Sequence, residues 1–272
     1  MLTGFGVGTE VVPMSTSGDR GARPDQSPAG LKGLFVHEIV RALQDGDIDV
    51  AVHSAKDLPA EDPDGVAVAA VPKRGSPWDV VVTRDGGLRV GATVGSSSLR
   101  RRAQIVRWDQ DVRPVDVRGN VDTRLRKLAD GEVDALVLAE AGLARLAVSP
   151  AHVSRLAPEE MVPAPGQGAL AVQTRLGEED LVVALDDPAS RAAFDAERRL
   201  VGLMGGGCAL PLGALAEAVD GSVRLRAIAL TPDGSEAVSA EHRGDDPQAV
   251  ATAVAEELLQ QGADRILARV RA

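Results

Sequence analysis

The chain has 272 residues, 44% of them hydrophobic and 26% charged, with a formal net charge of −10 at pH 7. This length predicts two or three domains able to bury a good core, and the acidic balance argues against a general nucleic-acid-binding protein. No apolar run approaches about 18 residues, no secretory signal pattern opens the chain, and Cys208 is the only cysteine, which excludes a membrane span and intramolecular disulfides and favours the cytoplasm.

Apolar β-rich runs alternate with helical patterns from residue 10 to residue 146. The predicted strands are 10–14, 48–53, 66–71, 79–83, 92–95, 112–117 and 134–139, and the predicted helices are 34–44, 98–108, 121–129 and 141–146. Residues 15–33 are rich in Gly, Ser and Pro and read as a long loop. The alternation predicts an α/β protein with parallel sheets and crossover helices.

Two segments rich in proline and glycine, residues 72–78 and 163–168, are typical of the paired crossings of a two-lobed hinge. The tail has its own pattern and predicts a third, smaller domain with helices at 188–203 and 247–269, strands near 212–218 and 222–230, and a turn at Cys208. The expected division is 1–72 with 169–186 for the first lobe, 73–168 for the second lobe, and 187–272 for the C-terminal domain.

Basic residues concentrate between Leu99 and Lys127. Nine bases and four acids give this stretch a charge of +5, so the rest of the chain carries −15. Such an island indicates a focused anion site on an otherwise acidic protein, although some of these arginines are equally well explained as solvated helix faces.

Two motifs in this island combine a strand end, a small-residue loop and the start of a helix: GSSSLRR at 95–101 and RGNVDTRL at 118–125. Free backbone N–H groups and hydroxyls at such a helix start favour anions. Arginine in a first turn is disfavoured by the helix dipole unless an anion is bound there. Ser98 also fits a plain N-cap, which is compatible with anion binding.

A third motif, HSAKDLP at 53–59, places polar residues at the carboxyl end of an apolar strand. Ligand sites of α/β sheets gather at such ends. Asp57 is therefore a candidate for chemistry, with a plain turn before Pro59 as the alternative. Cys208, which follows three glycines, is open to two interpretations: a thiol presented on a turn, or a small buried apolar residue.

Further motifs follow in order along nearly the whole chain. They are Gly33-Leu34-Phe35 with Glu38, LAEAGLARL at 138–146, PGQGAL at 165–170, AER at 196–198 and GGC at 206–208. Together with the three motifs above, they resemble one family, the porphobilinogen deaminases, also called hydroxymethylbilane synthases. Each motif alone is weak, but their common order is very specific.

The resemblance implies a transferase of heme biosynthesis that joins four porphobilinogen molecules into the linear tetrapyrrole hydroxymethylbilane and releases ammonia at each addition. It implies two periplasmic-binding-protein-like lobes around a cleft and a smaller α+β C-terminal domain. It also implies a dipyrromethane cofactor, held by Cys208 through a thioether, that primes the growing chain. The expected protein is a cytoplasmic monomer with porphobilinogen as its partner and with no nucleic acid, membrane or metal.

The same resemblance assigns roles to individual residues. Asp57 is the catalytic carboxylate, which stabilises positive charge on pyrrole intermediates and moves protons. The residues implied to bind the carboxylates of the cofactor and of the growing chain are Lys32, Ser54, Lys56, Ser96, Ser98, Arg100, Arg101, Arg118, Arg124, Arg145 and Gln167.

One departure from the family pattern concerns the amino terminus. The family begins with a strand and a helix that carry a Thr-Arg-x-Ser-x-Leu-Ala-type motif, whereas here residues 10–19 match the family's second strand. We therefore expect a first sheet without its central strand, and an upstream extension of the reading frame that restores it.

Two rival interpretations come from other classes. A non-enzymatic two-lobed binding protein for a small polycarboxylate fits the crossings and the arginines but needs neither Cys208 nor Asp57. An RNA-binding module is disfavoured because residues 99–127 offer only one aromatic residue, Trp108, for base stacking.

Overall fold

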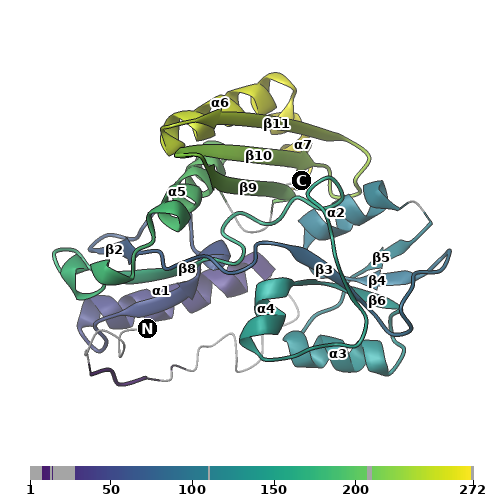
Figure 1. Cartoon of the computed structure of the whole chain (residues 1–272), viewed down its shortest axis with the longest axis horizontal. Coiled ribbons are helices and arrows are strands. Elements are labelled where there is room, and N and C mark those ends of the chain that lie inside the picture. Colours follow the sequence, from purple (N-terminus) through teal and green to yellow (C-terminus); the bar gives the residue numbers. More distant parts are fainter. Residues whose placement is uncertain (1–7, 13, 15–27, 110, 207–209, 271–272) are drawn as a thin grey trace.

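The computed structural model describes residues 8–12, 14, 28–109, 111–206 and 210–270, with the backbone alone for residues 28–35. Three sheets organise these residues, and Figure 1 shows the C-terminal sheet above the other two. Among the described residues, no helix is long and apolar enough to span a membrane.

The first sheet has three strands in the order β1 (Ala51–Ser54), β8 (Leu170–Arg175) and β2 (Val66–Ala70). Both pairings are antiparallel, so the expectation of a parallel sheet is wrong here. The centre of the described sheet belongs to β8, a strand that the sequence analysis did not predict. It returns from the other side of the molecule and separates β1 from β2, which run in the same direction.

Helix α1 (Pro28–Asp45) packs on one face of this sheet. Val36, Val40 and Leu43 of the helix join a buried cluster with residues of all three strands. The short 3₁₀ turns η3 (Glu179–Leu181) and η4 (Val183–Leu185) lie near the opposite face, where Leu185 packs against buried residues of β2 and β8.

Two predictions near the amino terminus are wrong. Residues 28–33, expected in a loop, form the first turns of α1, since proline is well suited to the first turn of a helix. Residues 10–12 and 14, expected in a strand, are outside any strand, and Val11 is 86% exposed. Apolar residues alone do not make a strand, because a strand also needs a neighbour for its backbone hydrogen bonds.

The five-stranded sheet has the order β5 (Arg113–Val115), β4 (Thr93–Gly95), β6 (Ala135–Ala139), β3 (Asp79–Thr83) and β7 (Val153–Arg155). β4 is parallel to both of its neighbours, whereas β3 is antiparallel to β6 and β7. The predicted crossover helices are confirmed as α2 (Leu99–Trp108) and α3 (Val121–Ala129), and α4 (Glu140–Arg145) follows β6. Separate buried clusters contain Ile105 of α2 and Leu128 of α3.

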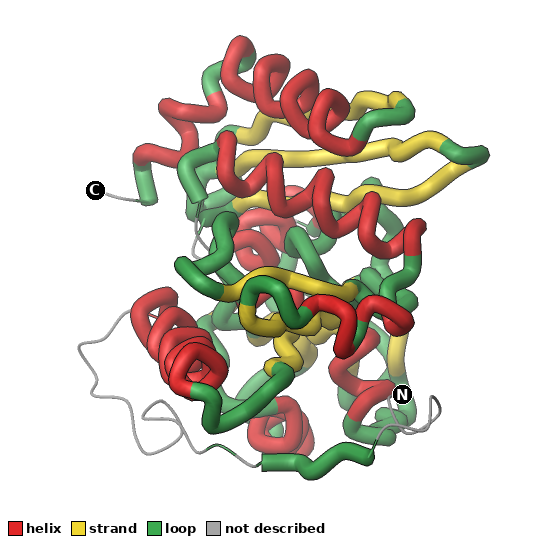
Figure 2. The backbone as a smooth tube through the Cα atoms, turned by 90° about the vertical axis from the view of Figure 1, so that its left-hand side faces the viewer, coloured by secondary structure: helices red, strands yellow, loops and turns green. Residues whose placement is uncertain are grey.

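The C-terminal sheet is antiparallel, in the order β11 (Ala237–Gly244), β10 (Ser222–Leu230) and β9 (Leu212–Val219). Helices α5 (Pro188–Leu203) and α6 (Pro247–Gln260) form a layer against it (Figure 2). The single closing helix that was predicted is two helices, because Gly262 adopts a φ of 91° between α6 and α7 (Ala263–Ala268).

Two crossings connect the first sheet to the five-stranded sheet: residues 71–78 between β2 and β3, and residues 156–169 between β7 and β8. The second crossing lies directly on the end of β1. A Cβ on Gly166 would lie 2.7 Å from the backbone nitrogen of Lys56, and Ala55 donates its N–H to the carbonyl of Ala169 at 3.1 Å. No side chain fits between these two backbones.

The two crossings also contact each other. Gly75 donates its N–H to the carbonyl of Gly168 at 3.1 Å. Gly168 has a φ of 85°, and a Cβ there would lie 2.5 Å from the carbonyl oxygen of Ser76. Both the backbone conformation and the lack of space therefore require glycine.

A buried carboxylate joins both crossings to the C-terminal domain. Glu197 of α5 is 1% exposed and accepts hydrogen bonds from Arg74 at 2.8 and 3.1 Å, from the N–H of Gly166 at 2.5 Å, and from the N–H of Ala216 at 2.7 Å. With partners in three other segments, the two crossings and β9, this carboxylate joins the three sheets.

The contact between the crossings yields a prediction about stability. Gly177→Ala changes a glycine with nearly the same φ, 86°, but with open space around it. It should cost about 1–2 kcal/mol of unfolding free energy for the left-handed conformation. Gly168→Ala should cost about 1–3 kcal/mol more, because the added methyl group meets backbone atoms. Denaturant unfolding of both variants tests this, and equal losses would show that the close approach does not limit stability.

Candidate functional site

The first part of the site is the turn that ends β1. η2 (Ala55–Asp57) follows Ser54 directly and leaves Lys56 and Asp57 half-buried. The N–H of Leu58 closes the turn on the carbonyl of Ala55, and the extended backbone of Leu58 leads into Pro59. The strand therefore delivers Ser54, Lys56 and Asp57 within one turn, as the HSAKDLP motif predicted.

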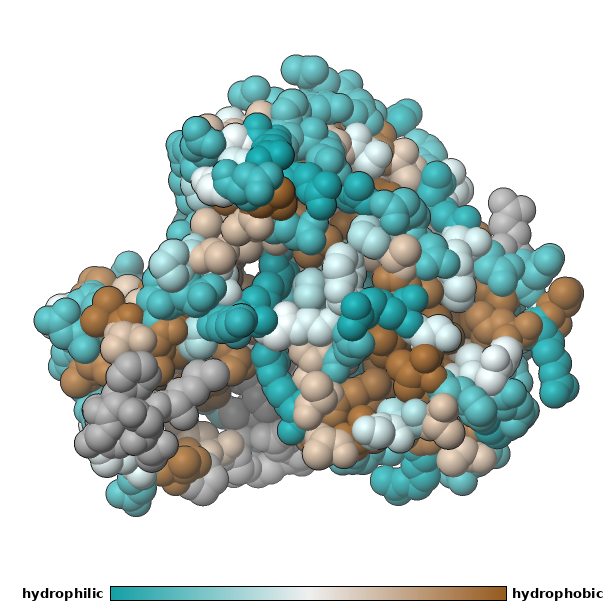
Figure 3. Space-filling view, viewed as in Figure 1, coloured by the Kyte–Doolittle hydropathy of each residue, from teal (hydrophilic) through white to brown (hydrophobic). Residues whose placement is uncertain are grey.

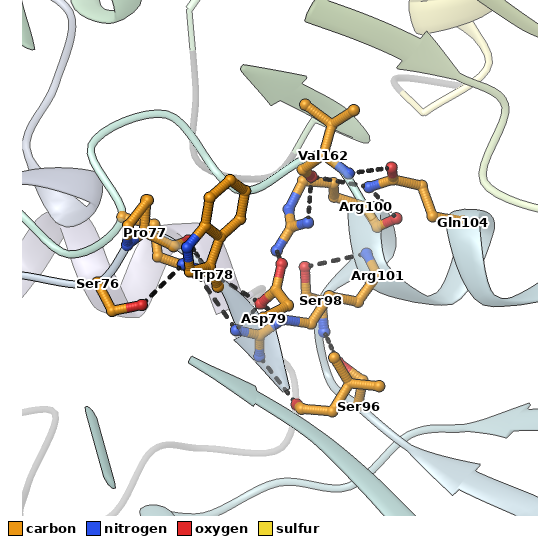
Figure 4. A network of polar contacts seen from close by, with 12 residues as sticks. Ser76, Pro77, Trp78, Asp79, Ser96, Ser98, Arg100, Arg101, Gln104 and Val162 are labelled. Atoms are coloured by element: carbon orange, nitrogen blue, oxygen red, sulfur yellow. Dashed lines mark hydrogen bonds and ion pairs between the residues drawn. The ribbon is translucent and has the colours of Figure 1, made fainter. Parts of the chain in front are cut away.

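The second part is a buried cluster of two guanidinium groups around one carboxylate (Figure 4). Asp79, the first residue of β3, is fully buried, and its carboxylate lies 2.9 Å from Nη2 of Arg100 and 2.8 Å from Nη2 of Arg101. Arg101 Nε also donates to Asp79 Oδ1 at 2.9 Å, and its Nη1 donates to the carbonyl of Val137 at 3.1 Å.

The cluster carries one positive charge in excess, because two cations face one anion. Burial lowers the pKa of Arg100 to about 10, although the charge of Asp79 opposes the change, so this guanidinium stays charged at neutral pH. Burial also opposes ionisation of Asp79, but Arg100, Arg101 and Gln167 outweigh it and hold the pKa of Asp79 below its ordinary value. Arg100 Nε is buried and has no hydrogen-bond partner among the described residues. A second carboxylate would balance the cluster.

The start of α2 lies beside this cluster. Ser98 caps the helix by accepting from the N–H of Arg101 at 3.4 Å, as predicted, and Ser96 is fully buried with its hydroxyl accepting from the N–H of Ser98 at 3.2 Å. Arg124 of α3 reaches the same loop and donates to Ser97 Oγ at 3.1 Å. Burial and the nearby charge of Arg101 lower the pKa of Arg124.

Gln167 and Gly166 bring the two parts together. The side chain of Gln167, 1% exposed, donates to Asp79 Oδ1 at 3.1 Å and accepts from Arg101 at 3.3 Å. The preceding residue, Gly166, packs against Lys56. The arginine cluster and the Asp57 turn therefore contact adjacent residues of the second crossing, and Figure 3 shows hydrophilic side chains around the hollow between the two sides of the molecule.

The remaining predicted residues are more scattered. Arg145 donates to the carbonyl of Gly168 at 2.7 Å and so lies at the second crossing. Arg118 is exposed and pairs with Asp116 at 2.9 Å, away from Asp79. Lys32 lies on α1, but its side chain is outside the described set, and Cys208 lies outside the described residues altogether.

Three residues of this region were not predicted as site residues: Asp79, His53 and Gln104. Asp79 had a detectable signal, since it is an acid at the head of the apolar run Val80-Val81-Val82. Gln104 had no detectable signal in the sequence, because its hydrogen-bond partner belongs to the second crossing, far away along the chain. It donates to the carbonyl of Val162 at 3.0 Å and accepts from that residue's N–H at 2.8 Å, which holds α2 against the crossing.

This arrangement suits a ligand with several carboxylates. Arginine forks bind carboxylates in paired hydrogen bonds, the helix start offers further N–H donors, and a carboxylate with a lysine lies across the second crossing. The described residues contain no group of three or more His, Cys, Asp or Glu side chains that could hold a metal ion.

Family models match two parts of the chain. Residues 2–183 match the model described as Porphobilinogen deaminase, dipyromethane cofactor binding domain, and residues 192–260 match Porphobilinogen deaminase, C-terminal domain. Among solved structures, an amino acid ABC transporter substrate-binding protein from Streptococcus pneumoniae is 15% identical over 62% of this chain and 68% of its own, with a TM-score of 0.33.

Proteins named porphobilinogen deaminase are similar over nearly the whole chain. The Rubrobacter xylanophilus protein is 42% identical over 279 residues, which cover 99% of this chain and 90% of the relative. The Thermus thermophilus protein is 44% identical over 268 residues, which cover 95% of this chain and 87% of the relative. The resemblance noted in the sequence is confirmed, and the chain belongs to the porphobilinogen deaminase family.

Proposed function

We propose that this protein joins four porphobilinogen molecules into hydroxymethylbilane, releases ammonia at each step, and uses a dipyrromethane primer on Cys208. The observation that carries the proposal is the buried cluster of Asp79, Arg100 and Arg101 with its unbalanced positive charge. Gln167 of the second crossing contacts this cluster, and the preceding residue, Gly166, contacts the Asp57 turn. A polycarboxylate binding protein also needs such a cluster, but the named relatives favour the enzyme.

The residues present fit a dipyrromethane cofactor, whose pyrrole rings carry acetate and propionate groups. The unpartnered Nε of Arg100 and the excess charge of the cluster call for an additional carboxylate. Arg100, Arg101 and Arg124 would hold such groups, with Ser96 and Ser98 as hydroxyl donors. When bound, the cofactor supplies the pyrrole carbon to which the first substrate is joined.

The chain's own groups have separate tasks in this reaction. Porphobilinogen loses its aminomethyl nitrogen as ammonia, which leaves an electron-poor carbon next to the pyrrole ring. The carboxylate of Asp57 accepts a hydrogen bond from a pyrrole N–H, stabilises the positive charge, and takes up the proton released when the new carbon–carbon bond forms. Lys56, Arg118 and Arg145 bind carboxylates of the growing chain.

We also propose a division into domains, a cellular location and an oligomeric state. The first lobe comprises residues 1–72 and 169–186, the second lobe 73–168, and the cofactor-bearing domain 187–272. Because this biosynthesis uses small soluble precursors, we place the protein in the cytoplasm. A monomer with porphobilinogen as its partner remains our prediction.

The covalent cofactor is tested by the mass of the intact protein purified from cells. We expect the chain mass plus two pyrrole units, and the bare chain mass for Cys208→Ala. An unmodified wild-type chain, or an adduct that survives Cys208→Ala, would count against the assignment.

The role of Asp57 is tested by Asp57→Asn, which keeps the size of the side chain and removes its charge. We expect kcat to fall by roughly 10²–10⁴-fold, the range for loss of a positioned acid–base group, with unchanged thermal unfolding. Asp64→Asn, the same change at an exposed position seven residues later, serves as the control. Near-normal kcat in a cofactor-loaded Asp57→Asn enzyme would return Asp57 to a turn-forming role.

The arginine cluster is tested by Arg100→Lys, which keeps the charge and removes the planar fork. A charge-assisted hydrogen bond is worth about 1.5–3 kcal/mol, so cofactor loading or substrate affinity should fall by roughly 10- to 150-fold. Arg102→Lys changes the half-buried neighbour that stands outside the Asp79 ion pairs and should have a much smaller effect. Equal losses would indicate a general electrostatic effect.

A further inference from the structure

The half-buried carboxylate of Asp62 has no part in the chemistry described above. It accepts hydrogen bonds from Arg198 at 2.9 and 3.1 Å, from Gln173 at 2.8 Å and from the N–H of Val68 at 3.3 Å. These donors belong to α5, β8 and β2. Burial opposes ionisation of Asp62, but Arg198, Gln173 and Val68 outweigh it and lower its pKa, so the pair with Arg198 is charged at neutral pH.

Arg198 holds both ends of the segment that follows the Asp57 turn. Its two terminal nitrogens bind Asp62, while its Nε donates to the carbonyl of Pro59 at 3.0 Å. Pro59 is two residues after Asp57, and Asp62 is five residues after it. The guanidinium also lies 5.5 Å from the centre of the Phe194 ring on the same helix, which favours a single orientation.

The network continues to the strand before the turn. Gln173, which is fully buried, and His53, which is 6% exposed, lie on the same face of the first sheet, because Gln173 pairs with Ala51 and His53 is two residues after Ala51 on β1. Burial lowers the pKa of His53, although the charges of Asp57 and Asp62 oppose the change, and His53 Nε2 has no hydrogen-bond partner among the described residues. The strand that leads into the Asp57 turn therefore carries a buried histidine on the same face of the sheet as the Gln173 partner of Asp62.

The backbone of Arg198 belongs to α5, the helix that precedes Cys208 in the chain. α5 ends at Leu203, five residues or about 7.5 Å of helix beyond Arg198, and Met204, Gly205 and Gly206 complete the described chain before the cysteine. Ala60, inside the segment that Arg198 holds, lies 3.7 Å from the Cβ position of Gly202 and 3.8 Å from that of Gly206. The segment after Asp57 thus rests on the end of α5.

We propose that Arg198 and Asp62 are positioning residues whose ion pair sets the separation between Asp57 and the end of α5, the helix that precedes Cys208 in the chain. The pair touches neither substrate nor cofactor in this scheme. It keeps the catalytic carboxylate in reach of the pyrrole units that the cysteine carries, so the inference rests on the proposed function. A misplacement of about 1 Å at a reacting centre costs up to roughly 10²-fold in rate, which makes such a support necessary.

The chain offers a matched control in Arg191. It lies on α5 seven residues, or about two turns, before Arg198. It makes the same kinds of contact, an ion pair with Asp186, just before α5, at 2.9 Å and a hydrogen bond to the carbonyl of Val68 in the first sheet at 3.1 Å. The Arg191 side chain is 24% exposed and that of Arg198 is 16% exposed. Arg198 differs in its bonds to Pro59 and Asp62, in its contact with the Phe194 ring, and in lying two turns nearer the end of α5.

The experiment compares Arg198→Lys with Arg191→Lys in the cofactor-loaded enzyme. We expect similar small losses in thermal stability for both variants. We expect kcat to fall by roughly 10- to 100-fold only for Arg198→Lys, with KM for porphobilinogen changed less than about threefold because binding is largely preserved. Arg198→Lys with Asp62→Asn should lose no more than either single variant, since both act through one ion pair.

Amide hydrogen exchange gives a readout that does not depend on turnover. The backbone amides of residues 55–60 should exchange faster in Arg198→Lys than in the wild type. Their exchange rates should be unchanged in Arg191→Lys. Equal kcat and equal exchange in the two variants would overturn the inference. A wild-type enzyme that carries the adduct but makes no hydroxymethylbilane would instead refute the proposed function, and the exchange measurement would still decide the role of Arg198.

Discussion

The architecture depends on the close contacts of the second crossing, which touches the end of β1 backbone to backbone at Gly166 and the first crossing at Gly168. Because no Cβ fits at either position, the first sheet and the five-stranded sheet approach more closely than side chains allow. Glu197 then ties these contacts to the C-terminal domain through Arg74, Gly166 and Ala216. A buried charge of this kind is tolerated only when its partners are complete, so the three sheets are held in one arrangement.

The same crossing relates the two halves of the site. Gln167 contacts the arginine cluster, and Gly166 contacts the turn that carries Asp57, so neither half moves without affecting the backbone between them. The polar groups of the site nevertheless differ in how far they are satisfied. Glu197 and Asp62 have full sets of donors, whereas the Asp79 cluster retains an excess positive charge and an unpartnered Arg100 Nε. Saturated groups support the structure, and the unsaturated cluster is suited to a ligand.

Helix α5 links these elements in sequence as well as in space. Near its start, the hydroxyl of Ser190 accepts a hydrogen bond from the N–H of Arg74 at 2.8 Å. Farther along the helix, Glu197 accepts from the N–H of Gly166, and Arg198 donates to the carbonyl of Pro59 in the segment after Asp57. The helix therefore contacts both crossings and the segment after the Asp57 turn. The separate antiparallel domain is thereby fixed against the site built on the other two sheets.

Sequence alone determined the elements with strong local signals and the residue types of the site. The helices after β4 and β5 have clear caps at Ser98 and Asn120, and the motif order identified the family, because motifs depend only on neighbours along the chain. Strand direction and partner choice were decided by the tertiary structure. β8 follows a glycine-rich crossing and enters the first sheet between β1 and β2 from a distant part of the chain, which local periodicity does not encode. Asp79, Asp62 and Gln104 likewise gained their roles from partners 22 or more residues away. A buried polar side chain is defined by the groups that satisfy it, and only the folded chain brings those groups together.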